Sequence, residues 1–512
     1  MKLIINCCLL VLLFNACNSG SVNLVSDAYV ELPNPRPTDK SAWQKAKPGM
    51  AISFASPDIR YKKEQFVLPE KNNSWKGKGW RGERIHTKIL ISTTDSVRGI
   101  AFTTSALKTN DGKLIPADHI SVKFIRYVMT DSIGRKGSGC GIEPDLDSSL
   151  SEDAIDNTTS LPIAANSSQP VWLSIRIPQD ATPGLYDGSI SVEGVADELT
   201  INYSVEVLNR TLPEPQAWNF HLDLWQNPFS IARVHNVKEW SNEHMDAMTP
   251  YMQMLANAGQ KVITTSIIHD PWNSQTFDVY KSMVKWVKKK DGSWSYDYSI
   301  FDKWVSYMMK TGISKQINCY SMIPWNLKFY YYDEAFEKDT LLIATPGTVA
   351  YEQHWKPMLV DFARHLKSKG WFDKTTIAMD ERPMEHMKLA LKIIKAADKN
   401  FKVSMAGNYH KEIEQDLYDY CVASAFILPE EVITRRKKDG FITTYYTACP
   451  EAYPNVFTFS PPVESAFLGW YAAAKGFDGY LRWAYNSWPE KPLLDSRFGH
   501  WSAGDTYFIY PG

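Results

Sequence analysis

The sequence predicts an α/β protein in which a (β/α)8 TIM-like barrel is preceded by an antiparallel β-sandwich domain. The first part of the chain shows short β-rich runs separated by turn residues, which is the pattern of a sandwich. After Trp218, strands alternate with longer amphipathic segments, which is the pattern of βα units around a parallel sheet. Because 512 residues exceed one typical domain, we place the sandwich at residues 24–210 and the barrel at residues 217–512.

The charge balance excludes several classes of partner. The 56 Lys and Arg residues nearly equal the 57 Asp and Glu residues, which leaves a formal net charge of -1. The compact basic run at residues 435–438 is short enough to be a solvated helix end. We therefore expect no nucleic-acid partner and a substrate that is uncharged or weakly charged.

The first 17 residues have the pattern of an export signal. The apolar run from Leu3 to Phe14 is too short to span a membrane, and Asn15-Ala16-Cys17 follows it. A small residue before a cysteine at this place resembles the bacterial lipoprotein cleavage box. We expect residues 1–17 to be a lipoprotein signal peptide, with Cys17 lipidated and the protein exported and anchored to a periplasmic or outer-membrane face. The alternative is an ordinary secretory signal with an incidental cysteine.

The remaining cysteines do not form a metal-binding or disulfide pattern. No CxxC pair occurs, and three of the four cysteines lie in apolar strand-like runs. We interpret Cys140, Cys319, Cys421 and Cys449 as small buried hydrophobes.

The sandwich prediction depends on β-rich runs separated by Gly, Asp, Asn and Pro. The clearest runs are Lys88–Ser92, Ser121–Val128, Val171–Ile177 and Ser189–Val195. Leu208–Gln216, which contains two prolines, is interpreted as the linker to the barrel.

The barrel prediction depends on eight strand candidates, which is the number that closes a parallel barrel. They are Trp218–Trp225, Val262–Ile268, Lys315–Ile323, Lys374–Glu381, Lys402–Tyr409, Tyr420–Phe426, Phe441–Cys449 and Phe477–Trp488. The predicted helices are Asn242–Ala258, Tyr298–Thr311, Val349–Lys369, Met384–Asp398, Lys411–Asp419, Pro429–Lys438 and Pro462–Lys475. Val284–Tyr296 is expected to be an inserted hairpin, and the last barrel helix is expected to be missing.

Two adjacent carboxylates, Asp380 and Glu381, end the fourth predicted strand and are the candidate catalytic pair. In such barrels the chemistry lies where strands end, and burial of one acid beside a hydrogen-bonded second acid suits general acid/base work. Successive strand residues point to opposite faces, so we expect an irregular strand end at this pair.

Other strand ends carry aromatic and polar residues together, which suits sugar rings because their CH faces stack and their hydroxyls need partners. Fourteen of the 18 tryptophans lie from Trp218 onward. The substrate-binding candidates are His221, Asp223, Trp225, His269, Tyr320, Asn408, Tyr409, Tyr446, Trp483, Tyr485 and Asn486, with Trp272 and Trp325 also near strand ends. No HxxxH or HxH pair supports a metal site, so we expect no metal and no cofactor.

Motifs in both halves of the chain resemble those of glycoside hydrolase family 123. They are Pro183–Gly188, Phe220–Trp225, Met379–Pro383, Arg482–Asn486 and Gly504–Gly512. The resemblance implies a β-N-acetylgalactosaminidase with a β-sandwich before a (β/α)8 barrel, acting on GalNAc-terminated glycans or glycolipids. The family usually continues into a helical segment beyond the final Tyr-Pro-Gly run, and this sequence does not include that segment.

The resemblance also implies roles for the acid pair in a substrate-assisted retaining reaction. Glu381 would protonate the glycosidic oxygen and later activate water, while Asp380 would orient the 2-acetamido group that attacks the anomeric carbon. A tyrosine donating to the acetamido carbonyl is expected, with Tyr446, Tyr485 and Tyr409 as candidates.

Three alternatives stay open at this point. The chain could be a non-catalytic glycan-binding lipoprotein, or a retaining glycosidase of other specificity whose nucleophile is a more distant acid. Candidates for that nucleophile are Glu451, Asp478 and Asp505. The acid pair could also be structural, ion-paired with Arg382 or Arg482.

Overall fold

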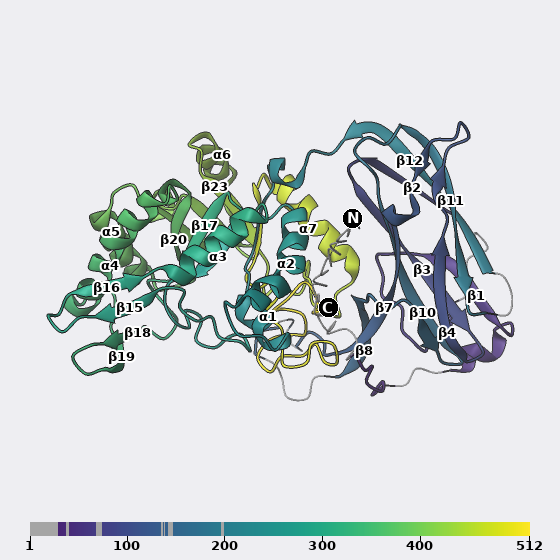
Figure 1. Cartoon of the computed structure of the whole chain (residues 1–512), viewed down its shortest axis with the longest axis horizontal. Coiled ribbons are helices and arrows are strands. Elements are labelled where there is room, and N and C mark those ends of the chain that lie inside the picture. Colours follow the sequence, from purple (N-terminus) through teal and green to yellow (C-terminus); the bar gives the residue numbers. More distant parts are fainter. Residues whose placement is uncertain are drawn as a thin grey trace, which may run out of the picture.

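The computed structural model describes residues 29–36, 40–67, 74–134, 137, 139–141, 147–195 and 199–512. The predicted signal peptide and its lipidated Cys17 lie outside these residues. A part built of sheets lies beside a barrel with helices on its outside (Figure 1). None of the described helices has the length and apolar character needed to cross a bilayer.

The N-terminal part consists of two sheets that share one core. The first has the order β1 (Met50–Ala55), β3 (Arg84–Thr93), β10 (Ser167–Arg176), β7 (Ile120–Thr130) and β8 (Ser149–Ile155). The second has the order β2 (Ser74–Arg81), β12 (Leu199–Thr211), β11 (Gly184–Glu193), β4 (Val97–Thr104) and β9 (Leu161–Ile163), with the short strands β5 (Leu107–Lys108) and β6 (Leu114–Ile115) beside it. All pairings are antiparallel except that of β2 with β12. The four predicted β-rich runs are thus confirmed as strands.

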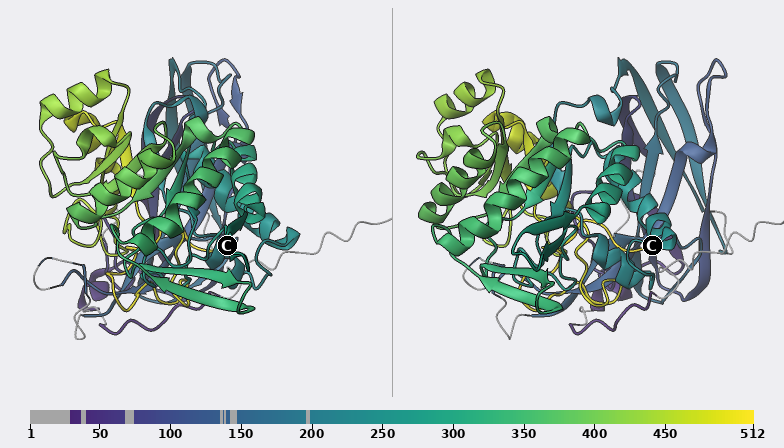
Figure 2. Two further views of the ribbon diagram at one scale, coloured as in Figure 1. Left: turned by 90° about the vertical axis from the view of Figure 1, so that its left-hand side faces the viewer. Right: turned by 60° about the vertical axis from the view of Figure 1, so that its left-hand side comes forward.

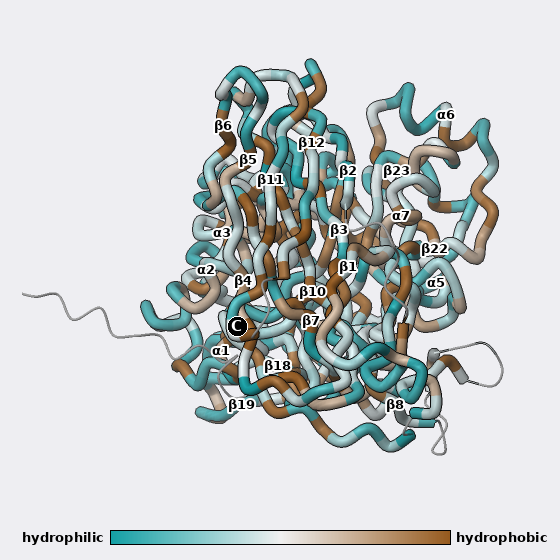
Figure 3. The backbone as a smooth tube through the Cα atoms, turned by 90° about the vertical axis from the view of Figure 1, so that its right-hand side faces the viewer, coloured by the Kyte–Doolittle hydropathy of each residue, from teal (hydrophilic) through white to brown (hydrophobic). Residues whose placement is uncertain are grey.

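Side-chain alternation explains why these strands form two layers. Along β12, Ile201, Tyr203 and Val205 are buried while the residues between them face outward. The buried side chains meet Val171 and Leu173 of the opposite sheet in a single apolar cluster. Figure 3 shows this alternation of apolar and polar residues along the sandwich strands.

The C-terminal part is a nearly closed barrel of eight parallel strands. Their order is β13 (His221–Leu224), β24 (Gly479–Arg482), β23 (Ile442–Tyr446), β22 (Asp419–Ala423), β21 (Lys402–Gly407), β20 (Thr375–Met379), β17 (Gln316–Tyr320) and β14 (Val262–Ser266). All eight predicted strands are confirmed, with shorter bounds. The end strands β13 and β14 meet at an isolated bridge between Leu222 and Gln260. Most strand residues are buried because the barrel interior covers one face and the outer elements cover the other.

Fewer helices surround the barrel than an ideal (β/α)8 fold would have. They are α1 (Pro228–Val234), α2 (Asn242–Asn257), α3 (Ser299–Lys310), α4 (Val349–Ser368), α5 (Met384–Ala397), α6 (Glu430–Lys438) and α7 (Pro462–Lys475). Six of the seven predicted helices are present. The seventh, at 411–419, is wrong, because this segment forms only a short 3-10 turn, Glu414–Asp416. No α-helix follows β24 in the described chain up to Gly512.

Tertiary contacts explain the missing helix at 411–419. The buried guanidinium of Arg436 donates to the backbone carbonyls of Glu414 (2.8 Å) and Leu417 (3.0 Å). The Glu414 carbonyl also accepts from the Leu417 backbone N–H at 3.4 Å in the 3-10 turn, and the side chain of α6 binds the carbonyl groups that a continuing α-helix would use. Helix α1, which was not predicted, begins where the Asn227 side chain accepts hydrogen bonds from two backbone N–H groups.

A small sheet extends the barrel. The expected hairpin is confirmed as β15 (Lys285–Lys288) and β16 (Trp294–Asp297). A second hairpin, β18 (Lys328–Asp333) and β19 (Lys338–Ile343), was not predicted and completes a four-stranded sheet in which β15 pairs with β18. Figure 2 shows this sheet at the lower edge of the barrel.

A disulfide and backbone contacts connect the two parts. Cys140, in the loop between β7 and β8, is bonded to Cys449, which follows β23. The interpretation of these two cysteines as buried hydrophobes is therefore wrong, because the fold brings together residues 309 positions apart. Cys319 and Cys421 are free and buried, as expected. The C-terminal segment also pairs with β7, since Ser496 donates its backbone N–H to Met129 at 2.9 Å.

Candidate active site

A cavity of about 380 Å³ opens at the carboxyl ends of the barrel strands. Its walls come from the loops after several strands and from the loop that carries Cys140. The lining residues are Cys140, Trp225, Trp272, Gln275, Trp325, Asp380, Glu381, Ala406, Asn408, Ala423, Ala425, Phe426, Tyr446, Ala448, Cys449, Pro450, Glu451, Leu481, Trp483, Trp501 and Asp505. In (β/α)8 barrels, this end of the strands is where catalytic residues lie.

The acid pair lies at the irregular strand end that the sequence predicted. Strand β20 ends at Met379, so Asp380 and Glu381 follow it outside the ladder. Asp380 is 6% exposed whereas Glu381 is exposed, yet both line the cavity. Two successive strand residues would point to opposite faces, so departure from strand geometry is what lets both carboxylates reach the same cavity.

Asp380 occupies a buried, partly unsatisfied position. Burial raises the pKa of its carboxyl to about 7, opposed by the positive charge of Arg382 and reinforced by the negative charge of Glu381. Among the described residues, Asp380 Oδ2 and Arg382 Nε are buried and have no hydrogen-bond partner, while the indole N–H of Trp272 faces the Asp380 carboxyl and lowers its pKa. Buried polar atoms are normally paired, so the two unpaired atoms are available to a ligand in the cavity.

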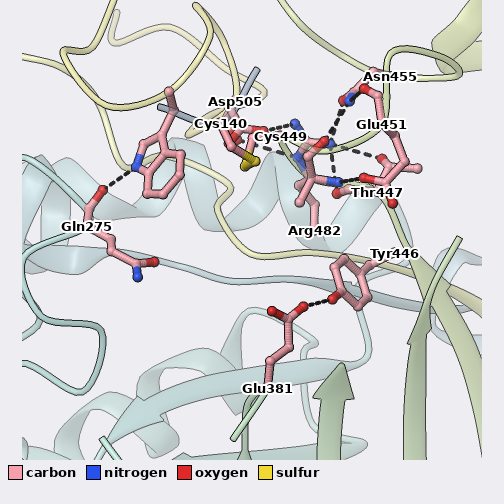
Figure 4. Close-up of a disulfide and its surroundings, with 12 residues drawn as sticks. Cys140, Gln275, Glu381, Tyr446, Thr447, Cys449, Glu451, Asn455, Arg482 and Asp505 are labelled. Carbon is pink, nitrogen blue, oxygen red and sulfur yellow. Dashed lines mark hydrogen bonds and ion pairs between the residues drawn. A yellow bond between two sulfur atoms is a disulfide. The ribbon is translucent and has the colours of Figure 1, made fainter. Parts of the chain in front are cut away.

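Glu381 is oriented by a tyrosine from a different strand. The hydroxyl of Tyr446, at the end of β23, donates a hydrogen bond to Glu381 Oε1 (Figure 4). Burial and the Glu381 charge both raise the pKa of Tyr446, so its hydroxyl stays a donor. Figure 4 shows Glu381 and Tyr446 on one side and the disulfide, Arg482 and Asp505 on the other.

The other acids of the cavity are already engaged. Glu451 accepts from the backbone N–H of Ala448 (2.8 Å) and from the Ser424 hydroxyl (3.1 Å). Asp505 forms a fully buried ion pair with Arg482. Among the described carboxylates of the cavity, Asp505 is thus ion-paired and both oxygens of Glu451 are held by neutral donors of its own loop region, whereas Asp380 Oδ2 has no partner.

Two further observations bear on the open alternatives. Asp478 accepts from the backbone N–H of Thr443 at the opposite end of the barrel, where β23 and β24 begin. No ion pair joins Asp380 or Glu381 to Arg382 or Arg482 within the described residues. The described structure therefore gives no ion pair that would make the two acids structural, and the Arg382 charge acts on Asp380 only by lowering its pKa.

Aromatic rings form the floor of the cavity. Trp225, Trp272 and Tyr320 pack against one another with ring centroids 4.5 to 5.1 Å apart. Trp225 and Trp272 line the cavity, and all three rings are buried. Such a floor can hold the apolar face of a sugar ring.

The structure brings some of the predicted substrate-binding residues together and places others elsewhere. Trp225, Asn408, Tyr446 and Trp483 line the cavity, and Tyr320 packs beneath it. The rings of His269 and Tyr409 lie against Tyr330 and Tyr420, respectively. Tyr485 donates to the Tyr251 carbonyl, and Asn486 donates to the Asn227 carbonyl, so these two residues fix loops in this structure.

His221 and Asp223 lie deeper inside the barrel. The Nε2 atom of His221 is 3.5 Å from Asp419 Oδ2, and Asn318 donates to Asp223 at 3.2 Å. Burial, together with the charge of Asp419, raises the pKa of Asp223 to about 7. The described residues contain no group of three or more His, Cys, Asp or Glu side chains placed to hold a metal ion.

Several lining residues carried no signal that the sequence could reveal. Trp501 lies far beyond the last strand, and its indole N–H donates to the backbone carbonyl of Gln275 at 2.9 Å. Phe426 was placed within a predicted strand but lies in the loop after β22. Trp272 and Trp325 had a weak signal, namely their positions after strands two and three.

Comparison with known proteins identifies the class of protein that carries this site. The model of the glycoside hydrolase 123 catalytic domain matches residues 225–512, and that of the glycoside hydrolase 123 N-terminal domain matches residues 54–194. The chain therefore belongs to glycoside hydrolase family 123 and is a glycosidase.

A solved structure agrees with this assignment. A family 123 glycoside hydrolase from Clostridium perfringens, analysed for glycolipid glycan hydrolysis, is 30% identical, covers 90% of this chain and 83% of its own, and has a TM-score of 0.84. A β-glucuronidase from Bacteroides uniformis is 10% identical over 89% of this chain and 50% of its own, with a TM-score of 0.29. The search of curated protein sequences gave no match.

Proposed function

We propose that this chain is an exo-acting retaining β-N-acetylgalactosaminidase that releases terminal GalNAc from glycans or glycolipids, with the substrate's 2-acetamido group as nucleophile. The observation that carries the proposal is the adjacent acid pair in a cavity whose other carboxylates are engaged. Because the other described carboxylates of the cavity are ion-paired or hydrogen-bonded on both oxygens, we take the substrate itself as the source of the nucleophile. The analysis of glycolipid glycan hydrolysis in the Clostridium perfringens relative supports the substrate class.

The reaction assigns one task to each acid. Glu381, held by Tyr446, donates its proton to the glycosidic oxygen as the bond to the anomeric carbon breaks. The acetamido carbonyl oxygen attacks that carbon and closes an oxazolinium ring. Glu381, now a carboxylate, takes a proton from water as the water opens this ring with overall retention.

Asp380 stabilises the intermediate through the acetamido N–H. Its unpaired Oδ2 atom is the acceptor, and the ionised form is required because the oxazolinium carries a positive charge. Deprotonation of Asp380 is therefore a condition for activity. The indole N–H of Trp272, at the same end of the cavity, favours the ionised form of Asp380.

The test is the release of nitrophenol from β-GalNAc, β-GlcNAc and β-Gal aryl glycosides, measured side by side on the chain without residues 1–17. Hydrolysis of β-GalNAc with no hydrolysis of β-Gal would support the proposal. Hydrolysis of β-Gal would replace the acetamido group with an enzyme nucleophile. A folded chain that hydrolyses none of the three would favour a glycan-binding role.

The location of the protein is also a proposal. We infer that Cys17 carries a lipid that anchors the exported chain to a membrane. The Cys140–Cys449 disulfide supports export, because disulfides persist in oxidising compartments. Metabolic labelling with a radioactive fatty acid, compared between the wild-type chain and Cys17→Ala, tests this inference.

A further inference from the structure

Trp325 differs from the other tryptophans that line the cavity. It lies in the loop after β17 and is 41% exposed, whereas Trp225 and Trp272 are 3% and 5% exposed. Its backbone N–H donates to the Pro271 carbonyl at 3.1 Å, which ties its loop to the loop after β14. A large apolar ring kept this open to solvent at a cavity wall is suited to contact a ligand.

One face of the Trp325 ring is covered by a cation. The guanidinium carbon of Arg382 lies 3.6 Å from the ring centroid, which is a close cation–π contact. Arg382 is partly buried and directly follows Glu381 in the chain. The contact therefore fixes the ring to the segment that carries the acid/base residue, and the Trp325 side chain remains 41% exposed.

Strand order places Trp325 beside the acid pair, and its exposure distinguishes it from the buried floor. Strand β20, which ends at the acid pair, has β17 on one side and β21 on the other. Trp325 follows β17, whereas the buried floor around Trp225 and Trp272 closes the interior of the cavity. In the proposed reaction, the terminal sugar occupies the floor, and Glu381 reaches the oxygen that links this sugar to the next group.

We propose that Trp325 is a specificity-determining platform for the sugar on the leaving-group side of the scissile bond, which stacks on the exposed indole. This inference rests on the proposed function. It predicts that the chain is built for oligosaccharide ends whose second unit is a pyranose ring, because a flat indole matches the CH face of such a ring. Arg382 is a positioning residue that holds the platform.

Equilibrium binding in the Glu381→Gln variant tests the platform without turnover. The two probes are free N-acetylgalactosamine and a disaccharide of β-linked N-acetylgalactosamine on galactose. We expect Trp325→Ala to raise the Kd of the disaccharide about tenfold and to leave the Kd of the monosaccharide unchanged. Trp325→Phe, which keeps an aromatic face, is expected to restore most of the affinity, and Arg382→Met to give a smaller selective loss.

The matched control is Trp470→Ala, because Trp470 is 75% exposed on α7 and does not line the cavity. Equal weakening of both probes by Trp325→Ala would overturn the proposal, and so would an unchanged Kd for the disaccharide. Phe426 is the other exposed aromatic ring among the described residues that line the cavity. If Phe426→Ala, and not Trp325→Ala, selectively raised the Kd of the disaccharide, the platform would be Phe426 and the proposal would be wrong. A failure of the proposed function can be told apart from a failure of the platform proposal. In the first case the wild-type chain would not hydrolyse aryl glycosides.

Discussion

Asp380→Asn is expected to stabilise the folded protein at alkaline pH while it slows hydrolysis. The Asp380 carboxyl has a folded-state pKa of about 7, against an ordinary value of 3.8, because burial penalises its charge. A carboxyl with a raised pKa binds its proton more tightly in the folded state, so its contribution to stability is lost as pH rises from about 4 to about 7. At pH 8 the shift of roughly 3 units corresponds to about 4 kcal/mol of destabilisation in the wild type.

The neutral asparagine removes this cost, and the benefit depends on pH. From the same two pKa values, the stability gained by Asp380→Asn should be about 2.5 kcal/mol larger at pH 8 than at pH 5. Equilibrium urea unfolding of both proteins at the two pH values measures this difference, and all other titrating groups cancel in the comparison. Equal gains at pH 5 and pH 8 would refute the reasoning, since Asp380 would then ionise with its ordinary pKa.

Three more predictions concern catalysis, and a fourth concerns the disulfide. Glu381→Gln should abolish hydrolysis of oligosaccharides but retain part of the activity on nitrophenyl glycosides, which need little acid assistance; equal losses on both would contradict its role as the acid. Tyr446→Phe removes the donor to Glu381 and should lower kcat about 10- to 100-fold on natural leaving groups, as steady-state kinetics would show. Wild-type kcat/KM should fall tenfold per pH unit below about pH 7 as Asp380 becomes protonated, and a flat profile from pH 5 to 8 would oppose that requirement. Cys449→Ser should cost about 2–4 kcal/mol of stability in urea unfolding, with an unchanged midpoint contradicting a structural role for the bridge.

The features that the sequence predicted correctly are local or periodic. The barrel strands are short, mainly apolar runs. For a strand that is buried on both faces, such a run is enough to predict the strand from the sequence. The position of the acid pair at a strand end was predictable because two carboxylates directly follow such a run, and their catalytic role stays a prediction. The apolar strands are covered on both sides in the folded barrel, and the polar strand ends face the cavity.

The features that could not be predicted depend on contacts between distant segments. The disulfide joins cysteines that share no sequence pattern, and Tyr446 reaches Glu381 from a strand 65 residues away. The segment at 411–419 has helical periodicity, but Arg436 from α6 binds its carbonyl groups instead. In each case the local structure depends on an interaction with a residue that is distant in the sequence. The position of that residue is defined only in the folded chain.

Both parts of the chain contribute to the wall of the catalytic cavity, at the disulfide that joins them. Cys140 belongs to the sandwich, yet it lines the cavity together with Cys449 of the barrel, and the Asp131 side chain nearby accepts a hydrogen bond from the backbone N–H of Ala503 at 3.0 Å. The two parts are therefore not interchangeable modules. A chimera that joined this barrel to a foreign sandwich would lose a piece of the cavity wall. The sandwich and the barrel must therefore be inherited together for the cavity to stay complete.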